Sequence, residues 1–252
     1  RRQWQGTKGK DDFGQPLLAY AAPSAPAAAG TTAASFTSAQ LAACTSNFSD
    51  ELGKGAFGAD FGGTLPDGRR VAVKQMSLDA TVLKKGTEAT ATPSTGADKF
   101  TGEAGFRREL ETLGRCAHAN IVLLFGYCIE KRKAGRSTFS LVIEYMPGGS
   151  LLDALAAGRS RRQPALAAAP RLDVASDVAR GLHYLHTEAL LIHQDVKSDN
   201  VLLAFDGHSG RVVAKVADFG TARVVPKQAL QSHHSTRVVI GTTPYMPMEY
   251  MQ

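Results

Sequence analysis

Cysteine is scarce in this chain and long apolar runs are missing, and both shortages narrow the class of protein. The three cysteines, Cys44, Cys116 and Cys128, are odd in number and show no C-x-x-C spacing. This pattern argues against a disulfide framework or a zinc cluster and favours a reducing compartment. No apolar run reaches the length of a membrane span and no signal-peptide pattern opens the chain, so we expect a cytoplasmic segment without a span of its own.

Runs of one charge are also short, although the net charge is +6 from 29 basic and 23 acidic residues. The basic clusters are Arg69-Arg70, Lys131-Arg132-Lys133 and Arg161-Arg162, and no aromatic residues alternate with them. No nucleic-acid-binding module can be recognised. We interpret these clusters as solvated surface and expect no nucleic-acid partner.

The first third of the chain changes from low complexity to ordered patterns. Residues 1–35 are rich in Ala and Pro and predict a disordered linker. Residues 36–50 predict a short helix that is anchored by Phe36, Leu41 and Phe48. Residues 51–74 predict two strands joined by a turn at 66–68, and residues 79–102, which are low in complexity, predict a mobile loop.

Helical and strand patterns then alternate. Residues 103–117 predict a helix, with apolar residues at Phe106, Leu110 and Leu113. The runs 121–128 and 139–146 predict buried strands. Further predicted elements are a mobile stretch at 157–169 and short strands at 201–205 and 212–219. We expect an α+β fold with two lobes, a small antiparallel sheet lobe with one long helix and an incomplete, mainly helical large lobe.

The strongest helical pattern covers residues 171–186 and is amphipathic. Its apolar face would consist of Leu172, Ala175, Val178, Leu182 and Leu185. Its polar face would carry Arg171, Asp173, Asp177 and Arg180. The pattern predicts that the first face is buried and that the charged residues lie toward solvent.

A glycine-rich motif opens the ordered region. Gly53, Gly55 and Gly58 form G-x-G-x-x-G, whose backbone N–H groups can approach phosphate oxygens closely. The motif alone is weak, since many Gly-rich turns bind nothing. A strand, a turn and a second strand follow it, whereas a dinucleotide-binding fingerprint needs a helix there. A Walker-type loop is excluded because no G-K-[ST] ending is present.

The following VAVK run places a lysine under this motif. Strand alternation puts Ala72 and Lys74 on one face, where a small residue beside a lysine suits a flat base and its phosphates. An isolated strand lysine is more often a surface residue. Glu109 on the next predicted helix faces the same way as Leu113, four residues later, and could pair with Lys74 rather than being solvated.

A polar run and a DFG motif complete the set. The run IHQDVKSDN contains Asp195, Lys197 and Asn200, and Asp218 opens the motif Asp218-Phe219-Gly220. Two carboxylates and an amide oxygen are ligands that Mg²⁺ accepts alongside phosphates. An Asp that accepts a hydroxyl proton and a Lys that neutralises a transferring phosphoryl group form a phosphoryl-transfer set.

These motifs, in this order, resemble those of the protein kinase family. The matches are GKGAFG, VAVK, Glu109 in FRRELETL, HANIVLLFGYC, IEYMPGGSL, HQDVKSDN, DFG and GTTPYMPMEY, over about residues 51–252. The stretches FTSAQLAACTSNFSDELGKGAFG and STRVVIGTTPYMPMEY are similar to plant receptor-like kinases and the tyrosine-kinase-like group. Lys197 and Thr242 match the serine/threonine pattern. The resemblance implies a small lobe at residues 51–146, preceded by a segment at 36–50, and a partial large lobe at 147–252.

The resemblance also implies catalytic roles. Asp195 would be the catalytic base, Lys197 would steady the γ-phosphate of ATP, and Asn200 and Asp218 would bind Mg²⁺. An internal hydrophobic stack would contain Leu113, His193 and Phe219.

The same resemblance implies a nucleotide site. The glycines would cover the phosphates, and Lys74, held by Glu109, would contact the α- and β-phosphates. Ile143 would be the gatekeeper, and the backbone of Glu144 and Met146 would bind adenine above Leu202. The residues assigned to the site are Leu52, Gly53, Gly55, Gly58, Ala72, Lys74, Glu109, Ile143, Glu144, Met146, Ser150 and Leu202.

Two substitutions depart from the family pattern. Gln194 replaces the Arg that in many kinases clamps a phosphorylated activation loop, so we expect weak control by loop phosphorylation. Asp60 replaces the Val that roofs adenine. Because an unpaired buried carboxylate is costly, we expect either that Asp60 turns outward or that nucleotide binding is weak.

The sequence ends three residues after Glu249, in PMEYMQ, where the family has Ala-Pro-Glu. The resemblance implies further helices that would cover the apolar face of residues 171–186 and a buried Arg that would pair with Glu249. We therefore expect this chain alone to be prone to aggregation or partly unfolded.

The leading function is ATP- and Mg²⁺-dependent phosphorylation of Ser/Thr in a protein substrate. The alternative is a non-catalytic pseudokinase or scaffold, which Asp60 favours and the complete phosphoryl-transfer set opposes. A small-molecule phosphotransferase is a third reading, opposed by the GTTPYMPMEY segment, which in the family shapes a peptide site. Arg1-Arg2 and the linker are compatible with a membrane tether upstream. The sequence does not indicate the particular substrate or the oligomeric state.

Overall fold

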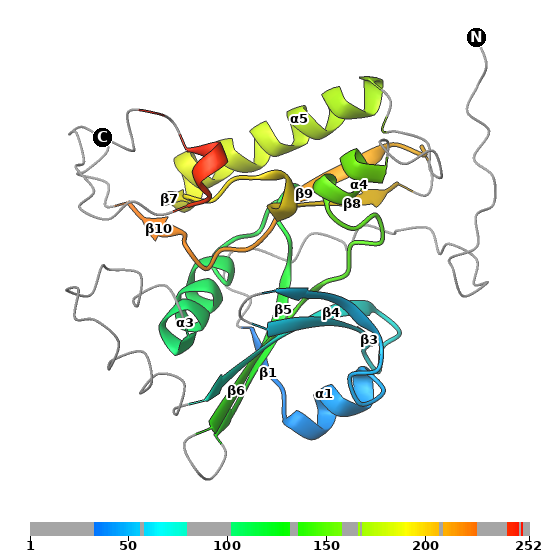
Figure 1. Ribbon diagram of the computed structural model, residues 1–252, viewed down its shortest axis with the longest axis vertical. Coiled ribbons are helices and arrows are strands. Elements are labelled where there is room, and N and C mark those ends of the chain that lie inside the picture. The colour runs from blue at the N-terminus through cyan, green and yellow to red at the C-terminus, as the bar shows by residue number, and fades with distance from the viewer. Residues whose placement is uncertain are drawn as a thin grey trace.

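The computed structural model describes residues 33–55, 58–79, 102–131, 136–157, 166, 168–206, 209–225, 241–246 and 248. The predicted linker up to residue 32, nearly all of the predicted loop at 79–102 and most of the stretch at 157–169 lie outside this part of the chain. The described residues form a sheet lobe and a second lobe that contains the longest helix (Figure 1).

A six-stranded sheet with the order β1-β5-β6-β4-β3-β2 forms the first lobe. Its strands are β1 (Ala34–Ser35), β2 (Glu51–Gly55), β3 (Gly58–Thr64), β4 (Arg70–Asp79), β5 (Leu124–Lys131) and β6 (Arg136–Glu144). The short β1 pairs in parallel with β5, and the other pairs are antiparallel. Val71 and Val73 are fully buried on one face of β4, and Lys74 lies on the other, as the alternation predicts.

One helix covers each face of this sheet. The first, α1 (Ser38–Cys44), inserts Leu41 into a cluster with Val71 and Val73. The second, α3 (Gly102–Leu113), packs Phe106 against Phe139 on the face that carries Lys74. Both helices were predicted, but α3 ends four residues before the predicted end at residue 117, where the backbone turns toward β5.

The N-terminal segment is built into the sheet lobe. Thr37 and Gln40 form a reciprocal capping box that starts α1. Ala34 and Phe36 lie against Gly126 so closely that a Cβ at this glycine would sit 2.3 Å from the Ala34 carbonyl oxygen. Ala34 and Ser35 fall inside the predicted linker of residues 1–35, so ordered structure begins earlier than predicted.

Two strand predictions need correction. Residues 51–74 contain three strands, not two, because β2 and β3 pair across Gly55 and Gly58 before β4 begins. The predicted strand at 121–128 begins only at Leu124. Ile121 instead bridges to Val216 of the other lobe, and this lobe contact takes the place of strand pairing.

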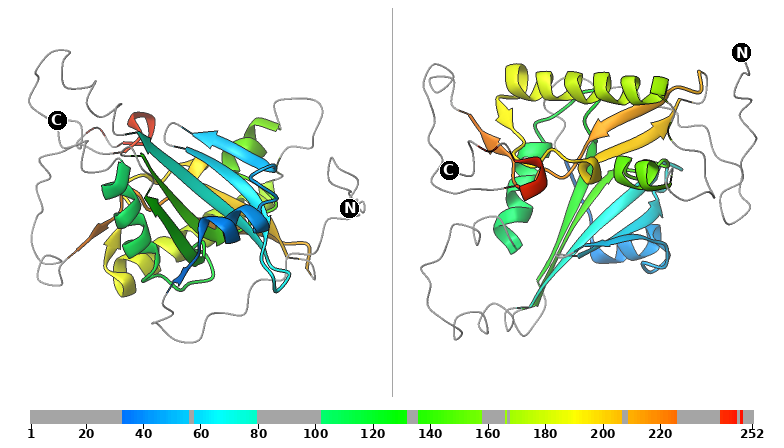
Figure 2. Two further views of the ribbon diagram at one scale, coloured as in Figure 1. Left: turned by 90° about the horizontal axis from the view of Figure 1, so that it is seen from below. Right: turned by 45° about the horizontal axis from the view of Figure 1, so that its top comes forward.

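The second lobe combines helices with short strand pairs. Its helices are α4 (Leu151–Ala157), α5 (Ala168–Tyr184), the π-helical turn η2 (Leu185–Ala189) and the 3₁₀ turns η3 (Ser198–Asn200) and η5 (Thr243–Tyr245). Its strands are β7 (Leu191–Ile192), β8 (Val201–Phe205), β9 (Val212–Val216) and β10 (Arg223–Val224). Helix α5 lies along the β8–β9 pair (Figure 2). No helix among the described residues has the length and apolarity of a membrane span.

The buried face of α5 differs from the predicted one. Leu172, placed on the buried face by the pattern, has 74% of its surface exposed. Asp177, placed on the polar face, has none. Val178, Leu182 and Leu185 of the predicted face do pack against the core. The buried residues of α5 itself are Val174, Asp177 and Gly181, so the prediction is right in part and the buried face is rotated from the predicted one.

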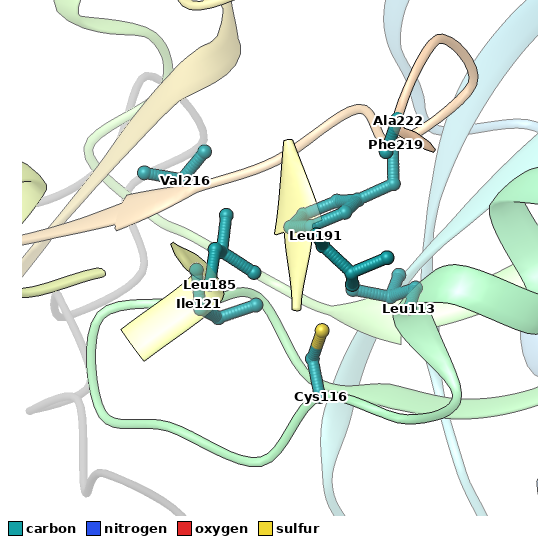
Figure 3. Close-up of a cluster of buried hydrophobic side chains, with 8 residues drawn as sticks. All are labelled: Leu113, Cys116, Ile121, Leu185, Leu191, Val216, Phe219 and Ala222. Atoms are coloured by element: carbon teal, nitrogen blue, oxygen red, sulfur yellow. The ribbon is translucent and has the colours of Figure 1, made fainter. Parts of the chain in front are cut away.

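The two lobes share a hydrophobic cluster between α3 and the segment of the second lobe that contains the DFG motif (Figure 3). It contains Leu113, Cys116, Ile121, Leu185, Leu191, Val216, Phe219 and Ala222. The ring of Phe219, from the DFG motif, is fully buried in it, next to Leu191 and Leu113. The cluster therefore fixes α3 relative to the segment that carries Asp218.

Candidate active site

Lys74 is the centre of the site on the sheet lobe. Its Nζ atom lies 2.9 Å from Oε1 and 3.0 Å from Oε2 of Glu109 on α3. It also lies 2.9 Å from Oδ1 of Asp218 in the second lobe. The predicted Lys74–Glu109 pair is therefore present, and a second carboxylate from the DFG motif joins it.

The charges around Lys74 stabilise one another. Burial alone would lower the pKa of Lys74, but the adjacent carboxylates of Glu109 and Asp218 outweigh it and raise the pKa above its usual value. Burial would likewise raise the pKa of Asp218, but Lys74 outweighs it and lowers that pKa. Lys74 is thus a cation and Asp218 an anion at neutral pH, the states that phosphate and metal binding require.

Asp195 is held by a compact set of hydrogen bonds. Its carboxylate lies 2.9 Å from Nζ of Lys197 and accepts a 2.7 Å bond from the Thr242 hydroxyl. The Asn200 amide donates to the Asp195 carbonyl and carboxylate oxygens at 2.9 and 3.2 Å. Partial burial would raise the pKa of Asp195, but these donors outweigh it and lower the pKa. The group is therefore an oriented carboxylate.

Thr242 is the link that the sequence motifs did not spell out. Its hydroxyl donates to Asp195 and accepts a 3.0 Å hydrogen bond from Nζ of Lys197. The residue belongs to the GTTPY segment, more than forty positions downstream, and no sequence motif predicts its contact with Asp195 or Lys197. In the structure it joins the predicted catalytic base to the predicted phosphate-binding lysine.

His193 and Phe219 support the catalytic loop from behind. The buried imidazole of His193 lies with Nε2 2.9 Å from the Ala217 carbonyl, and its Nδ1 accepts from the Asp195 backbone N–H. Its ring packs edge-on against Phe219 at 4.9 Å between centroids. Burial lowers the pKa of His193, so the ring is neutral at neutral pH. The predicted stack of His193, Phe219 and Leu113 is assembled around the interlobe cluster.

The residues predicted to surround adenine lie where the lobes join. Ile143 and Leu202 pack together with Met146, Val122 and Ala217. The Glu144 backbone N–H donates to the Leu123 carbonyl at 2.9 Å, so this group already has a partner. The Ser150 hydroxyl bonds Asp153 and caps α4, and its backbone bridges to Leu202. Ligand contacts of these residues stay a prediction.

A buried ion pair at this junction was missed from the sequence. The Glu144 carboxylate lies 2.8 Å from Nζ of Lys215 on β9, and both side chains are almost fully buried. The same carboxylate oxygen accepts from the Leu123 backbone N–H at 3.2 Å. Glu144 was predicted to act through its backbone alone. An apolar run interrupted by a single lysine, VVAKVADF, was the available signal for the pair.

The glycine motif is only partly explained by phosphate binding. Gly53 and Gly55 lie in β2, and Leu52 beside them is exposed. A Cβ at Gly58 would lie 1.9 Å from the Gln75 carbonyl oxygen of β4. Gly58 is therefore required by the close pairing of β3 with β4, whether or not a phosphate binds.

Asp60 lies on the face of the sheet that carries Lys74, its direct partner across β3 and β4. Burial raises the pKa of Asp60, and the charges of Lys74 and Asp218 also act on it, the first lowering and the second raising its pKa. The first of the two expected arrangements, an outward-turned Asp60, is therefore wrong.

Asn200 and Asp218 fit the requirements of a magnesium site. Asn200 donates through Nδ2 to Asp195, which leaves its carbonyl Oδ1 to act as an oxygen ligand. Asp218 uses Oδ1 toward Lys74 and retains its second carboxylate oxygen. Magnesium typically takes one or two protein oxygen ligands together with substrate phosphates. The donor chemistry of these two residues matches that pattern.

The site combines a lysine that is paired with a helix glutamate and with the DFG aspartate, and a loop that carries an aspartate, a lysine and an asparagine. In a two-lobed fold, this combination is typical of phosphotransferases. The family model of the protein kinase domain matches residues 46–252. The chain therefore belongs to the protein kinase family.

Sequence relatives of the chain include plant receptor-like kinases. The chain is 41% identical over 226 residues to a probable LRR receptor-like serine/threonine-protein kinase of Arabidopsis thaliana, covering 86% of this chain and 17% of the relative. It is 36% identical to the proline-rich receptor-like protein kinase PERK8 of Arabidopsis thaliana, over 85% of this chain and 27% of the relative. The chain thus spans about a sixth to a quarter of the length of these receptor-like kinases.

Solved structures with the same fold include pseudokinases. An apo pseudokinase matches with a TM-score of 0.54 at 25% identity, over 74% of this chain and 62% of that one. The pseudokinase DRIK1, bound to ENMD-2076, matches with the same TM-score and identity over 76% and 64%. The two-lobed kinase fold is therefore confirmed. Because both neighbours are named pseudokinases, the fold alone does not establish catalytic activity.

Proposed function

We propose that the protein is an ATP- and Mg²⁺-dependent serine/threonine kinase that acts on protein substrates. The observation that carries the proposal is the pairing of Lys74 with both Glu109 and Asp218 at 2.9 Å, together with an Asp195 carboxylate that is held by Lys197 and Thr242. Such an arrangement positions a phosphate and a hydroxyl group for transfer between them.

The chain's own groups divide the work of transfer. Lys74 would hold the α- and β-phosphates, and bound Mg²⁺ would neutralise phosphate charge beside Asn200 and Asp218. The Asp195 carboxylate would orient the substrate hydroxyl and take its proton as the hydroxyl oxygen bonds to the γ-phosphorus and the bond to the β-phosphate oxygen breaks. Lys197 would stabilise the charge on the transferring group, and ADP would leave.

Binding and turnover can be tested separately. We expect calorimetry to show Mg·ATP binding that survives Asp195→Asn and falls with Lys74→Met, because only the second variant removes a phosphate contact. Phosphate transfer to a protein substrate should be lost in both. Mg·ATP binding that is unaffected by Lys74→Met would contradict the proposed site.

A non-catalytic pseudokinase is the second candidate. Asp60 on the nucleotide face favours it, as do two solved pseudokinases among the structural neighbours, one of them holding the ligand ENMD-2076. Against it stands the complete set of Lys74, Asp195, Asn200 and Asp218, which a scaffold does not require. Absence of Mg·ATP binding in a folded sample would favour this candidate.

Regulation and location belong to the same proposal. Gln194 offers a neutral amide where an Arg clamp would need a charged group, so activity should depend little on phosphorylation of the activation loop. The receptor-like relatives support a cytoplasmic kinase segment with a membrane tether upstream.

A further inference from the structure

Strand β3 offers a single functional side chain to the nucleotide face of the sheet. Asp60 pairs with Lys74 across β3 and β4, and its neighbours on the same face are Gly58 and Gly62, which pair with Met76 and Ala72. Directly paired residues direct their side chains to the same face, with Cβ atoms about 5 Å apart. Any ligand that lies under β3 therefore meets the Asp60 carboxylate.

The charge balance of this face is negative. The ammonium of Lys74 already contacts the carboxylates of Glu109 and Asp218 at 2.9 Å. Asp60 is the third carboxylate within electrostatic range, and the charges of Lys74 and Asp218 both act on it. Lys54 offers no compensation on this face because it pairs with Ala59, whose side chain alternates to the opposite side.

A phosphate chain would enter this field at an energetic disadvantage. Its negative charges approach Lys74 to replace or share contacts with Glu109 and Asp218. They then lie near the Asp60 carboxylate, and β3 carries no cationic side chain that would neutralise it. Repulsion between like charges at about 6 Å in a partly buried site changes a binding constant by tens of fold. An uncharged nucleoside does not experience this repulsion.

We propose that Asp60 is a specificity-determining residue that selects ligands bound beside Lys74 by charge, disfavouring the triphosphate of ATP relative to an uncharged purine nucleoside. The inference rests on the proposed function, because it assumes that the nucleotide binds beside Lys74 and Leu202. In this account, the Asp that replaces Val at residue 60 weakens the affinity for ATP through its charge and not through a changed shape of the site.

Calorimetry with two probes, Mg·ATP and adenosine, tests this at about pH 8, where carboxylates are ionised. Asp60→Asn keeps the shape and removes the charge, and Asp60→Val removes the polar group as well. The matched control is Asp67→Asn, which changes the net charge equally but lies in the exposed turn between β3 and β4. Thermal unfolding of each variant shows that it is folded.

We expect Asp60→Asn and Asp60→Val to lower the Kd for Mg·ATP at least about tenfold. Asp60→Asn should change the Kd for adenosine less than about threefold, and Asp67→Asn should change neither. The gain for Mg·ATP should shrink as salt is added, since it is electrostatic.

Two outcomes would overturn the inference in distinguishable ways. Equal Kd values for Mg·ATP in the wild type and both Asp60 variants would refute charge selection and leave the kinase proposal standing. If no folded form binds either probe, the nucleotide site itself is absent, and the proposed function falls together with the inference.

Discussion

The buried carboxylate of Asp177 provides the sharpest test of how the second lobe is held together. Asp177 lies on α5 with no exposed surface. Its carboxylate accepts from the Ala214 backbone N–H at 2.9 Å and from Nη2 of Arg211 at 2.6 Å, and it also pairs with Arg180. Arg180 in turn donates to Asn120, in the segment that leads into β5. One side chain therefore ties α5 to β9.

The cost of Asp177→Ala follows from what each partner loses. Removing one partner of a buried ion pair costs about 3–5 kcal/mol, but Arg180 and Arg211 are 52% and 37% exposed and regain water, so their share is smaller. The Ala214 N–H is fully buried and would be left without an acceptor, at about 1–3 kcal/mol. We expect a loss of about 2–4 kcal/mol in the free energy of unfolding.

Urea unfolding followed by circular dichroism measures this loss. Asp173→Ala, one helical turn earlier, is the matched control. Asp173 is 46% exposed and its carboxylate makes only a long, 3.7 Å ion pair with Arg211, so its removal should cost less than about 1 kcal/mol. Asp177→Asn, which retains an oxygen for Ala214, should fall between the two. Equal stability of the Asp177→Ala and Asp173→Ala variants would refute the reasoning.

Three further predictions concern the site. Thr242→Ala should lower kcat about tenfold or more while Thr242→Ser restores most of it, because the hydroxyl joins Asp195 to Lys197; steady-state kinetics check both. Burial lowers the folded-state pKa of His193, so below about pH 6.5 the unfolded chain binds a proton that the folded chain resists, and the thermal midpoint should fall as the pH drops from about 7 to 5.5, less so in His193→Asn. Ser235 and Thr236 lie in the sequence between the DFG motif and GTTPY, where the activation loop of the family is expected. Ser235→Ala and Thr236→Ala, made singly, should each leave activity within about twofold, since Gln194 cannot form a charged clamp; a large loss from either one in a phosphotransfer assay would contradict this.

The core of the site could be predicted because local patterns determine it. Alternation along VAVK places Lys74 opposite the buried Val71 and Val73, and helical spacing brings Glu109 onto the face that meets it. The short polar run keeps Asp195 and Asn200 only five residues apart, so sequence proximity becomes spatial proximity. Strand and helix periods make these contacts possible, and the resemblance to the kinase family selects them from the alternatives.

The remaining contacts depend on partners that are distant in sequence. Asp177 is buried only because Ala214, Arg180 and Arg211 surround it, and hydrophobicity alone assigned it to the solvent side of α5. Helical periodicity ranks a carboxylate as polar, whereas the structure satisfies all its acceptors internally. Leu172 shows the converse, since its exposure depends on what packs outside α5 and not on its own hydrophobicity.

The two halves of the site lead to different expectations for catalysis. Asp195, Lys197 and Thr242 contact one another and would take part in the transfer step after the nucleotide has bound, so changes to them should alter kcat. Asp60 acts on the binding of the phosphate chain, both before and during transfer, which concerns KM. A carboxylate that repels bound substrate and transition state alike raises KM without changing kcat. The protein should therefore transfer phosphate at an ordinary rate at saturating ATP, and Asp60→Asn should lower KM for ATP while leaving kcat nearly constant.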